Sequence, residues 1–119
     1  MRKEDLKEFI FLKREAQQCD RELKLLKRAA LENKCLARKI YPLEQKTLNL
    51  KKSALDKASA IKSYIQSCPE SYMRQILTLR YIEGYSWDKV AFKTGGRNKG
   101  DTIRKMAERY IQKTEKRSH

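Results

Sequence analysis

The sequence predicts an all-α protein in which a long, coiled-coil-like N-terminal helical segment precedes a unit of shorter helices. The first observation is that glycine and proline are absent from about Glu4 to Ile40, where apolar or small residues recur every three or four positions. The second is a C-terminal series of apolar helical stretches separated by Gly84 and by Gly95-Gly96. We therefore expect an N-terminal helical element over residues 1–67 and a separate domain over residues 68–119.

The N-terminal segment has the heptad spacing of a coiled-coil seam. Its positions follow one another in alternating steps of three and four residues: Phe9, Leu12, Ala16, Cys19, Leu23, Leu26, Ala30, Asn33, Ala37 and Ile40. A helix of this extent is ~50 Å long, which is too long to be buried against a small domain alone. Asn33 either fixes the register and partner of this seam or marks where the seam frays.

Tyr41-Pro42 is expected to interrupt this helix, because a residue before proline is disfavoured in the α conformation. A second helical face follows and reaches to about Gln66, with apolar positions at Leu43, Leu50, Ala54, Ala58, Ile61 and Ile65. Two geometries are open: an antiparallel hairpin, or a kinked junction that does not fold back. In a hairpin, surplus helix length is available to another subunit, so the sequence leaves two alternatives open: a homodimer through the N-terminal helices, or helices that pair only within one chain.

The C-terminal domain begins with signals of a helix start. Ser67 stands three residues before Glu70, the spacing of a reciprocal cap, and Pro69 suits a first helical turn. The apolar residues that share one face of this helix are expected to be Tyr72, Ile76, Leu79 and Ile82.

A short second helix is expected next. Gly84 can take a positive φ angle and end the first helix, and Ser86 can cap the second. The second helix is expected to bury Trp87, Val90 and Ala91 on one side. We interpret Trp87 as a core residue rather than a stacking platform, and Gly95-Gly96 as the end of this helix.

The third helix is predicted to start behind a reciprocal cap formed by Asn98 and Asp101. Its apolar stripe consists of Ile103, Met106, Ala107, Tyr110 and Ile111. Projected at ~100° per residue, the opposite side is polar and largely basic. An apolar back and a polar front are what a recognition helix needs, so the spacing of turns and caps predicts a helix-turn-helix that inserts this helix into the major groove. The competing interpretation is a solvated charged surface.

The predicted DNA-binding residues follow from this front face. They are Arg97, Asn98, Lys99, Asp101, Thr102, Arg104, Lys105, Arg109 and Lys113. We expect Arg97, Lys99 and Lys113 mainly to bind phosphate. Base contacts are expected from Asn98, Thr102, Lys105 and Arg109. Asp101 is either a helix cap or a base reader, and Arg104 lies along the edge of the face.

Part of this region resembles a known family. The run LRYIEGYSWDKVA from Leu79 to Ala91 is similar to region-4-like domains of sigma-70 factors. It is closer to phage-borne regulators built on that domain, the ArpU/RinA type of late-gene activator, and the run GRNKGDTIRKM from Gly96 to Met106 also resembles them. The resemblance covers roughly residues 70–113. It implies an activator that binds DNA upstream of a phage operon and acts with the host RNA polymerase.

The composition favours a polyanionic partner. The chain has 29 basic and 15 acidic residues, a net charge of +14. Such a charge fits nucleic acid or an anionic membrane surface. The excess is largest over residues 71–119, with twelve basic and five acidic groups, where phosphate neutralisation would require it. We therefore expect double-stranded DNA as the partner and no membrane.

Other function classes find little support in the sequence. No signal peptide is recognisable at Met1-Arg2-Lys3, and no stretch has the ~20 apolar residues of a membrane span. Cys19, Cys35 and Cys68 are odd in number and widely spaced, so we expect reduced cysteines, no metal site and a cytoplasmic protein in a bacterial host. The GGRNKGDT stretch superficially resembles a phosphate-binding loop, but Asp101 replaces its lysine and no strand precedes it. We expect neither enzymatic activity nor a cofactor.

The sequence thus predicts a site-specific DNA-binding transcriptional regulator, with a phage late-gene activator as its most specific form. The alternative is a phage small terminase subunit, or another helical packaging or interaction protein that binds DNA with little sequence preference. An activator is expected to be a monomer or dimer, whereas a terminase subunit forms a ring of many copies.

Overall fold

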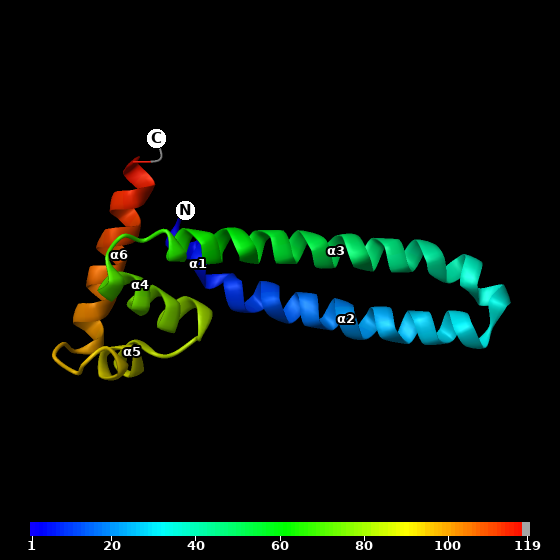
Figure 1. The fold of residues 1–119 in the computed structure, drawn as a ribbon, viewed down its shortest axis with the longest axis horizontal. Coiled ribbons are helices and arrows are strands. Elements are labelled where there is room, and N and C mark those ends of the chain that lie inside the picture. The colour runs from blue at the N-terminus through cyan, green and yellow to red at the C-terminus, as the bar shows by residue number, and fades with distance from the viewer. Residues whose placement is uncertain (118–119) are drawn as a thin grey trace. The chain divides into compact units, whose positions relative to one another are not determined.

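The computed structural model describes residues 1–117, and all secondary structure within this range is helical. In chain order the elements are α1 (Lys3–Lys7), α2 (Phe9–Glu32), α3 (Lys34–Gln66), α4 (Ser71–Leu77), the π-helical segment η1 (Thr78–Ile82), α5 (Trp87–Lys93) and α6 (Gly100–Arg117) (Figure 1). Two long helices precede the shorter C-terminal ones, as the sequence predicted. None of these helices has both the length and the apolarity needed to cross a bilayer.

The chain forms two compact units, each of which is described by itself. The hairpin unit comprises Phe11–Ala58, and the terminal unit combines Met1–Ile10 with the chain from Ser59 onward. This division differs from the expected boundary between residues 67 and 68. The first helical turns belong with the C-terminal helices because Leu6 of α1 is fully buried there.

In the hairpin unit, α3 runs back alongside α2 (Figure 1), so the antiparallel hairpin is the geometry that forms. Lys51 Nζ lies 2.5 Å from Asp20 Oδ1 across the two helices. The buried side chains of this unit are Leu12, Ala16, Cys19, Leu23, Ile40, Ala54 and Ala58. The expected seam is therefore buried throughout its first half, but in its second half only Ile40 is buried, while Leu26, Ala30 and Ala37 are half-buried.

The position of the turn between the long helices differs from the prediction. A single helix to Ile40 with a break at Tyr41-Pro42 was expected, but Glu8 separates α1 from α2, Asn33 separates α2 from α3, and Pro42 lies inside α3. Asn33 Oδ1 accepts a hydrogen bond from the Cys35 N–H at 3.0 Å. An asparagine that accepts a hydrogen bond from a free N–H at the start of a helix competes with continued helix. Pro42 lacks the N–H that would bond the carbonyl four residues back and its ring crowds that carbonyl, yet α3 continues through this exposed position.

In the terminal unit, α4 begins later than predicted. Its N-cap is Glu70, which makes no side-chain capping bond, and Ser67 Oγ instead donates to the Tyr64 carbonyl at the end of α3 over 2.7 Å. The reciprocal cap of Ser67 and Glu70 is therefore wrong, and Pro69 lies before the helix rather than in its first turn. The serine completes the preceding helix because Ser67 follows α3 directly.

The buried face of α4 and η1 also differs from the predicted one. Its buried residues are Met73, Ile76, Leu77 and Tyr81, whereas Leu79 and Ile82 are half-buried and Tyr72 is exposed. A π-helical turn holds more residues than an α turn, and the Glu83 N–H accordingly donates five residues back, to the Thr78 carbonyl, at 3.0 Å. This turn shifts the register and places Tyr81, rather than its neighbours, in the core. Gly84 then ends the helix at φ 79°, as predicted.

Tyr81 carries the one buried side-chain oxygen or nitrogen without a hydrogen-bond partner among the described residues. Its ring packs edge-on against Trp87, with centroids 6.2 Å apart. Burial raises the pKa of the Tyr81 hydroxyl to about 12, so the group stays neutral at physiological pH.

Replacing Tyr81 with phenylalanine is expected to leave stability unchanged or to raise it. An unpaired buried hydroxyl costs about 1–3 kcal/mol, and Tyr81→Phe removes it while keeping the ring contact with Trp87. Urea unfolding of the two proteins measures the difference. A loss of more than about 1 kcal/mol would show that the hydroxyl has a stabilising partner.

Candidate nucleic-acid interface

Helix α5 starts behind a serine cap and ends at two glycines, as predicted. Ser86 Oγ accepts from the Lys89 N–H at 3.3 Å at the start of α5. At its end, Gly95 and Gly96 have φ angles of 119° and 70°, and the Gly96 N–H donates to the Ala91 carbonyl at 2.9 Å. Glycine occupies such positive φ values without the penalty that a Cβ would impose.

Gly100 allows the first turn of α6 to approach the first turn of α5. A Cβ atom at this position would lie 2.8 Å from Asp88 N and 2.9 Å from Trp87 C, both of them backbone atoms of α5. Backbone cannot move aside as a flexible side chain can, so a residue without a side chain is needed here. The orientation of α6 on α5 therefore depends on Gly100.

The back of α6 is buried in the terminal unit. Ile103 and Ala107 are fully buried, Ile111 is 2% exposed, and Met106 and Tyr110 border them as half-buried residues. The helix packs against α4 and α5. This arrangement confirms the predicted apolar stripe.

The opposite side of α6 is exposed and mainly basic. Eight of the nine predicted DNA-binding residues are exposed: Arg97, Asn98, Lys99, Asp101, Thr102, Lys105, Arg109 and Lys113. The first three lie in the turn before α6, Thr102, Lys105, Arg109 and Lys113 lie on its outer face, and Asp101 lies on the edge that it shares with Glu108. Arg104 is half-buried and belongs to a different side of the helix.

The start of α6 differs from the predicted reciprocal cap. Asn98 Nδ2 donates to the Tyr72 hydroxyl at 3.5 Å, and the Ile103 N–H donates to the Lys99 carbonyl at 3.1 Å. Asp101 accepts hydrogen bonds from the Arg104 side chain and lies 3.4 Å from Lys105 Nζ. Its carboxylate is thus drawn towards cations one turn along the helix, and these bonds lower the pKa of Asp101.

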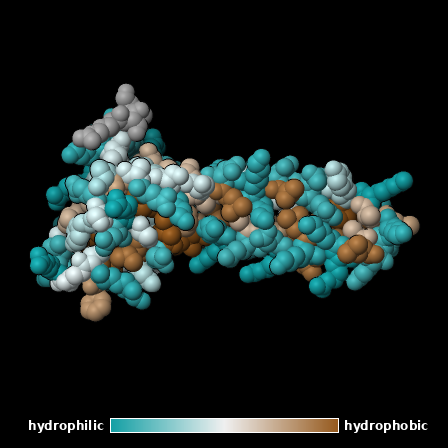
Figure 2. Space-filling view, viewed as in Figure 1, coloured by the Kyte–Doolittle hydropathy of each residue, from teal (hydrophilic) through white to brown (hydrophobic). Residues whose placement is uncertain are grey.

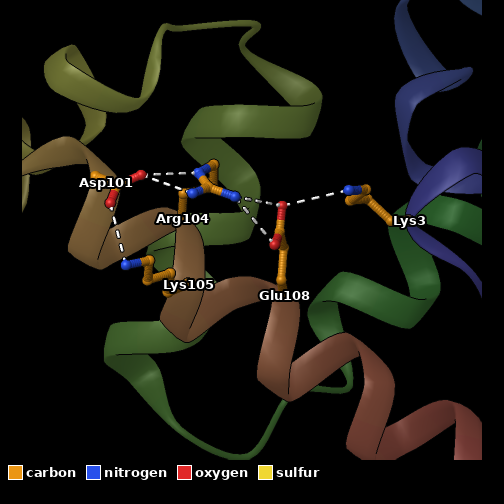
Figure 3. A network of polar contacts seen from close by, with 5 residues as sticks. All are labelled: Lys3, Asp101, Arg104, Lys105 and Glu108. Atoms are coloured by element: carbon orange, nitrogen blue, oxygen red, sulfur yellow. Dashed lines mark hydrogen bonds and ion pairs between the residues drawn. The ribbon is translucent and has the colours of Figure 1, made fainter.

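A chain of ion pairs connects the edge of α6 to α1 (Figure 3). Arg104 Nη2 lies 2.6 Å from Asp101 Oδ1, and its Nη1 lies 3.2 Å from Glu108 Oε2. Glu108 Oε1 also accepts from Lys3 Nζ at 3.3 Å. Burial by itself raises the pKa of Glu108, but the bonds from Lys3 and Arg104 outweigh burial and hold this pKa below its ordinary value.

This network divides the charges of α6 between two sides. The carboxylates of Asp101 and Glu108 bind the guanidinium of Arg104, and Glu115 binds Arg2, the residue that precedes α1, at 3.2 Å. The acidic side chains therefore gather on the edge that meets α1. The outer face is left with Lys105, Arg109, Lys113 and Lys116 as its cations.

Sequence reasoning did not identify a second group of exposed residues, on α5. The ammonium groups of Lys89 and Lys93 lie 4.6 and 4.9 Å from the ring centroid of Tyr85, and Phe92 is 80% exposed. The sequence held the signal: the two lysines are four residues apart, and Phe92 falls off the face that buries Val90 and Ala91. Trp87, predicted to be buried, is half-buried beneath Arg80, whose Cζ lies 4.8 Å from the ring centroid.

No group of three or more histidine, cysteine or acidic side chains within residues 1–117 is placed to hold a metal ion. Cys19 and Cys68 are buried and Cys35 is exposed, all three as free thiols. Comparison of the chain with protein-family models, curated proteins and solved structures finds no match.

Replacing Gly100 with alanine is expected to destabilise the protein by about 1–3 kcal/mol, the range for overpacking. The sign of the stability change is diagnostic, because alanine normally stabilises a helix relative to glycine. Urea unfolding measures the change, and Thr102→Ala on the exposed side of the same turn is the control. A stabilised Gly100→Ala protein would contradict the close approach of α5 and α6.

Replacing Glu108 with glutamine is expected to lower the melting temperature near neutral pH and to lose this effect in acid. The folded-state pKa of Glu108 is lowered, so its charge stabilises the fold above the ordinary glutamate pKa and ceases to do so as pH falls through the folded value. The loss is expected to be below about 1 kcal/mol, since Lys3 and Arg104 are more than a third exposed.

Thermal unfolding from pH 7 down to about pH 3, spanning the carboxylate titration range, measures this difference. Glu83→Gln, at an exposed carboxylate of the same unit, is the control. A difference between wild type and Glu108→Gln that stays constant with pH would rule out the ion pairs as its source.

Proposed function

We propose that the protein is a site-specific DNA-binding transcriptional regulator that places the outer face of α6 in the major groove of double-stranded DNA. The observation that carries the proposal is the opposition of two faces on α6. Ile103, Ala107 and Ile111 are buried on one side, while Lys105 and Arg109 are exposed on the other. A recognition helix requires such a buried back and a free polar front.

The turn before α6 adds cations where a phosphate backbone would pass. Arg97 and Lys99 are exposed there, immediately before the N-terminal end of α6. Lys89 and Lys93 supply two more on α5, the helix that crosses the backbone in this kind of binding. We assign these four side chains, together with Lys113 on α6, to phosphate contacts, which position the protein without reading sequence.

Base contacts are assigned to Asn98, Thr102, Lys105 and Arg109, whose side chains are exposed. Asp101 holds Lys105 at 3.4 Å and is itself exposed, so it either orients the lysine or accepts a hydrogen bond from a base. Arg104 is a positioning residue in this proposal, because two carboxylates already bind its guanidinium.

The more specific role, a phage late-gene activator that acts with host RNA polymerase, follows from the resemblance of residues 70–113. It is testable by transcription in vitro with purified polymerase on a template that carries the selected site. The homodimer through the N-terminal helices stays a prediction.

The DNA-binding proposal is tested by selection from a random-sequence duplex library with the purified full chain. We expect one enriched motif. Lys105→Gln should then weaken binding to that motif by roughly tenfold or more, the value of a good base contact, and should affect bulk DNA less. Lys113→Gln should weaken both alike and reduce the salt dependence by about one phosphate contact.

Lys62→Gln is the matched control, since it removes an exposed lysine of α3 that lies outside the candidate interface. Selection without an enriched motif, or a uniform loss in the Lys105→Gln protein, would replace site-specific regulation with binding that has little sequence preference.

A further inference from the structure

The end of the helical hairpin lacks an apolar core. Between residues 24 and 53 only Ile40 is buried, and the expected seam positions Leu26, Ala30 and Ala37 are half-buried. Two helices alone bury too little apolar surface to offset the entropy of ordering them. Another surface that covers this end would supply the missing burial.

Three leucines of α3 form a continuous stripe on this end of the hairpin. Leu36, Leu43 and Leu50 recur every seven residues and are 41%, 53% and 51% exposed. A seven-residue repeat keeps side chains on one side of a helix and is the spacing by which helices pack along their length. We call these residues the leucine stripe. Figure 2 shows hydrophobic side chains interspersed among hydrophilic ones over the hairpin.

The surroundings of the leucine stripe are strongly basic. Residues 24–50 contain seven lysine or arginine residues and two glutamates, a net charge of +5. Within residues 1–117, none of these nine side chains is within 4.0 Å of an opposite charge. Lys39 and Lys46 each follow a stripe leucine by three residues, so they flank the stripe on one side.

We propose that the leucine stripe binds an acidic amphipathic helix of a partner protein. The apolar ridge of that helix would cover Leu36, Leu43 and Leu50, and its flanking carboxylates would pair with Lys39 and Lys46, as e and g charges do in coiled coils. The positive charge around the leucine stripe favours an acidic helix over other partners. A second copy of the chain would bring +5 against +5, which opposes association.

A lipid surface fits the geometry less well. Leu48 is also exposed, and five residues of α-helix place it about 140° around α3 from Leu43. A flat bilayer cannot cover both directions at once, whereas a helix laid along the stripe needs only one of them. Duplex DNA would engage the lysines and gain little from the leucines.

The test uses the full chain and a fluorescently labelled peptide probe of roughly 28 residues with Leu at a and d positions and Glu at e and g positions. The same peptide with lysine in place of each glutamate is the charge control. Fluorescence anisotropy measures binding from low to high salt. We expect the glutamate peptide to bind, the lysine peptide not to bind, and the affinity to fall as salt rises.

Two variants locate the surface. Leu36→Gln with Leu43→Gln and Leu50→Gln removes the stripe, and Lys39→Gln with Lys46→Gln removes its flanking charges while leaving the leucines in place. Each variant is expected to bind the glutamate peptide more weakly than wild type, on the order of tenfold. Two controls, Lys57→Gln with Lys62→Gln and Phe11→Gln, change exposed residues outside this end of the hairpin and should bind like wild type.

Several outcomes overturn the proposal. They are no binding of the glutamate peptide, equal binding by wild type and both variants, and equal binding of the two peptides. Self-association that strengthens with salt and is lost in the leucine variant would assign the stripe to a second copy. Stripe-dependent binding to phosphatidylglycerol vesicles in place of the peptide would assign it to a membrane. The hairpin variants should enrich the same DNA motif as wild type. A failure of the proposal for the leucine stripe is therefore distinguishable from a failure of the DNA-binding proposal.

Discussion

The burial of one side of α6 is the constraint on which the terminal unit depends. Ile103, Ala107 and Ile111 lose almost all contact with solvent, and α4 and α5 pack against this helix. Because a helix has two opposite sides, fixing the apolar side also fixes which side chains face outward. The same packing that stabilises the unit thereby presents Lys105 and Arg109 to solvent, without any separate structure to hold them there.

Electrostatic sorting refines this arrangement. The acidic residues of α6 lie along one edge, where they bind Arg104 and two cations near the start of the chain, Arg2 and Lys3. Had Glu108 or Glu115 pointed outward, each would repel a phosphate backbone. Their engagement with α1 makes the first residues of the chain part of the unit that carries the candidate interface.

The hairpin presents a different kind of surface. Its first half buries small residues such as Ala16, Ala54 and Ala58. Its far half exposes leucines and surrounds them with positive charge that has no ion-pair partner within residues 1–117. A polyanion would bind the positive charge alone and would not use the leucines. The combination of exposed leucines with positive charge is therefore the basis for proposing a protein partner there.

The sequence by itself determined the helical class, the turns at Gly84 and Gly95-Gly96, the Ser86 cap and the two faces of α6. These features depend on neighbours within one or two helical turns, so local patterns predict them. Tertiary structure decided the rest. The π-helical turn that buries Tyr81, and the pairing of Glu108 and Glu115 with Lys3 and Arg2 more than 100 residues away in the chain, each result from competition between alternatives of similar local energy. Only packing and charge partners contributed by other segments can settle such competition, and their positions are not encoded in the local pattern.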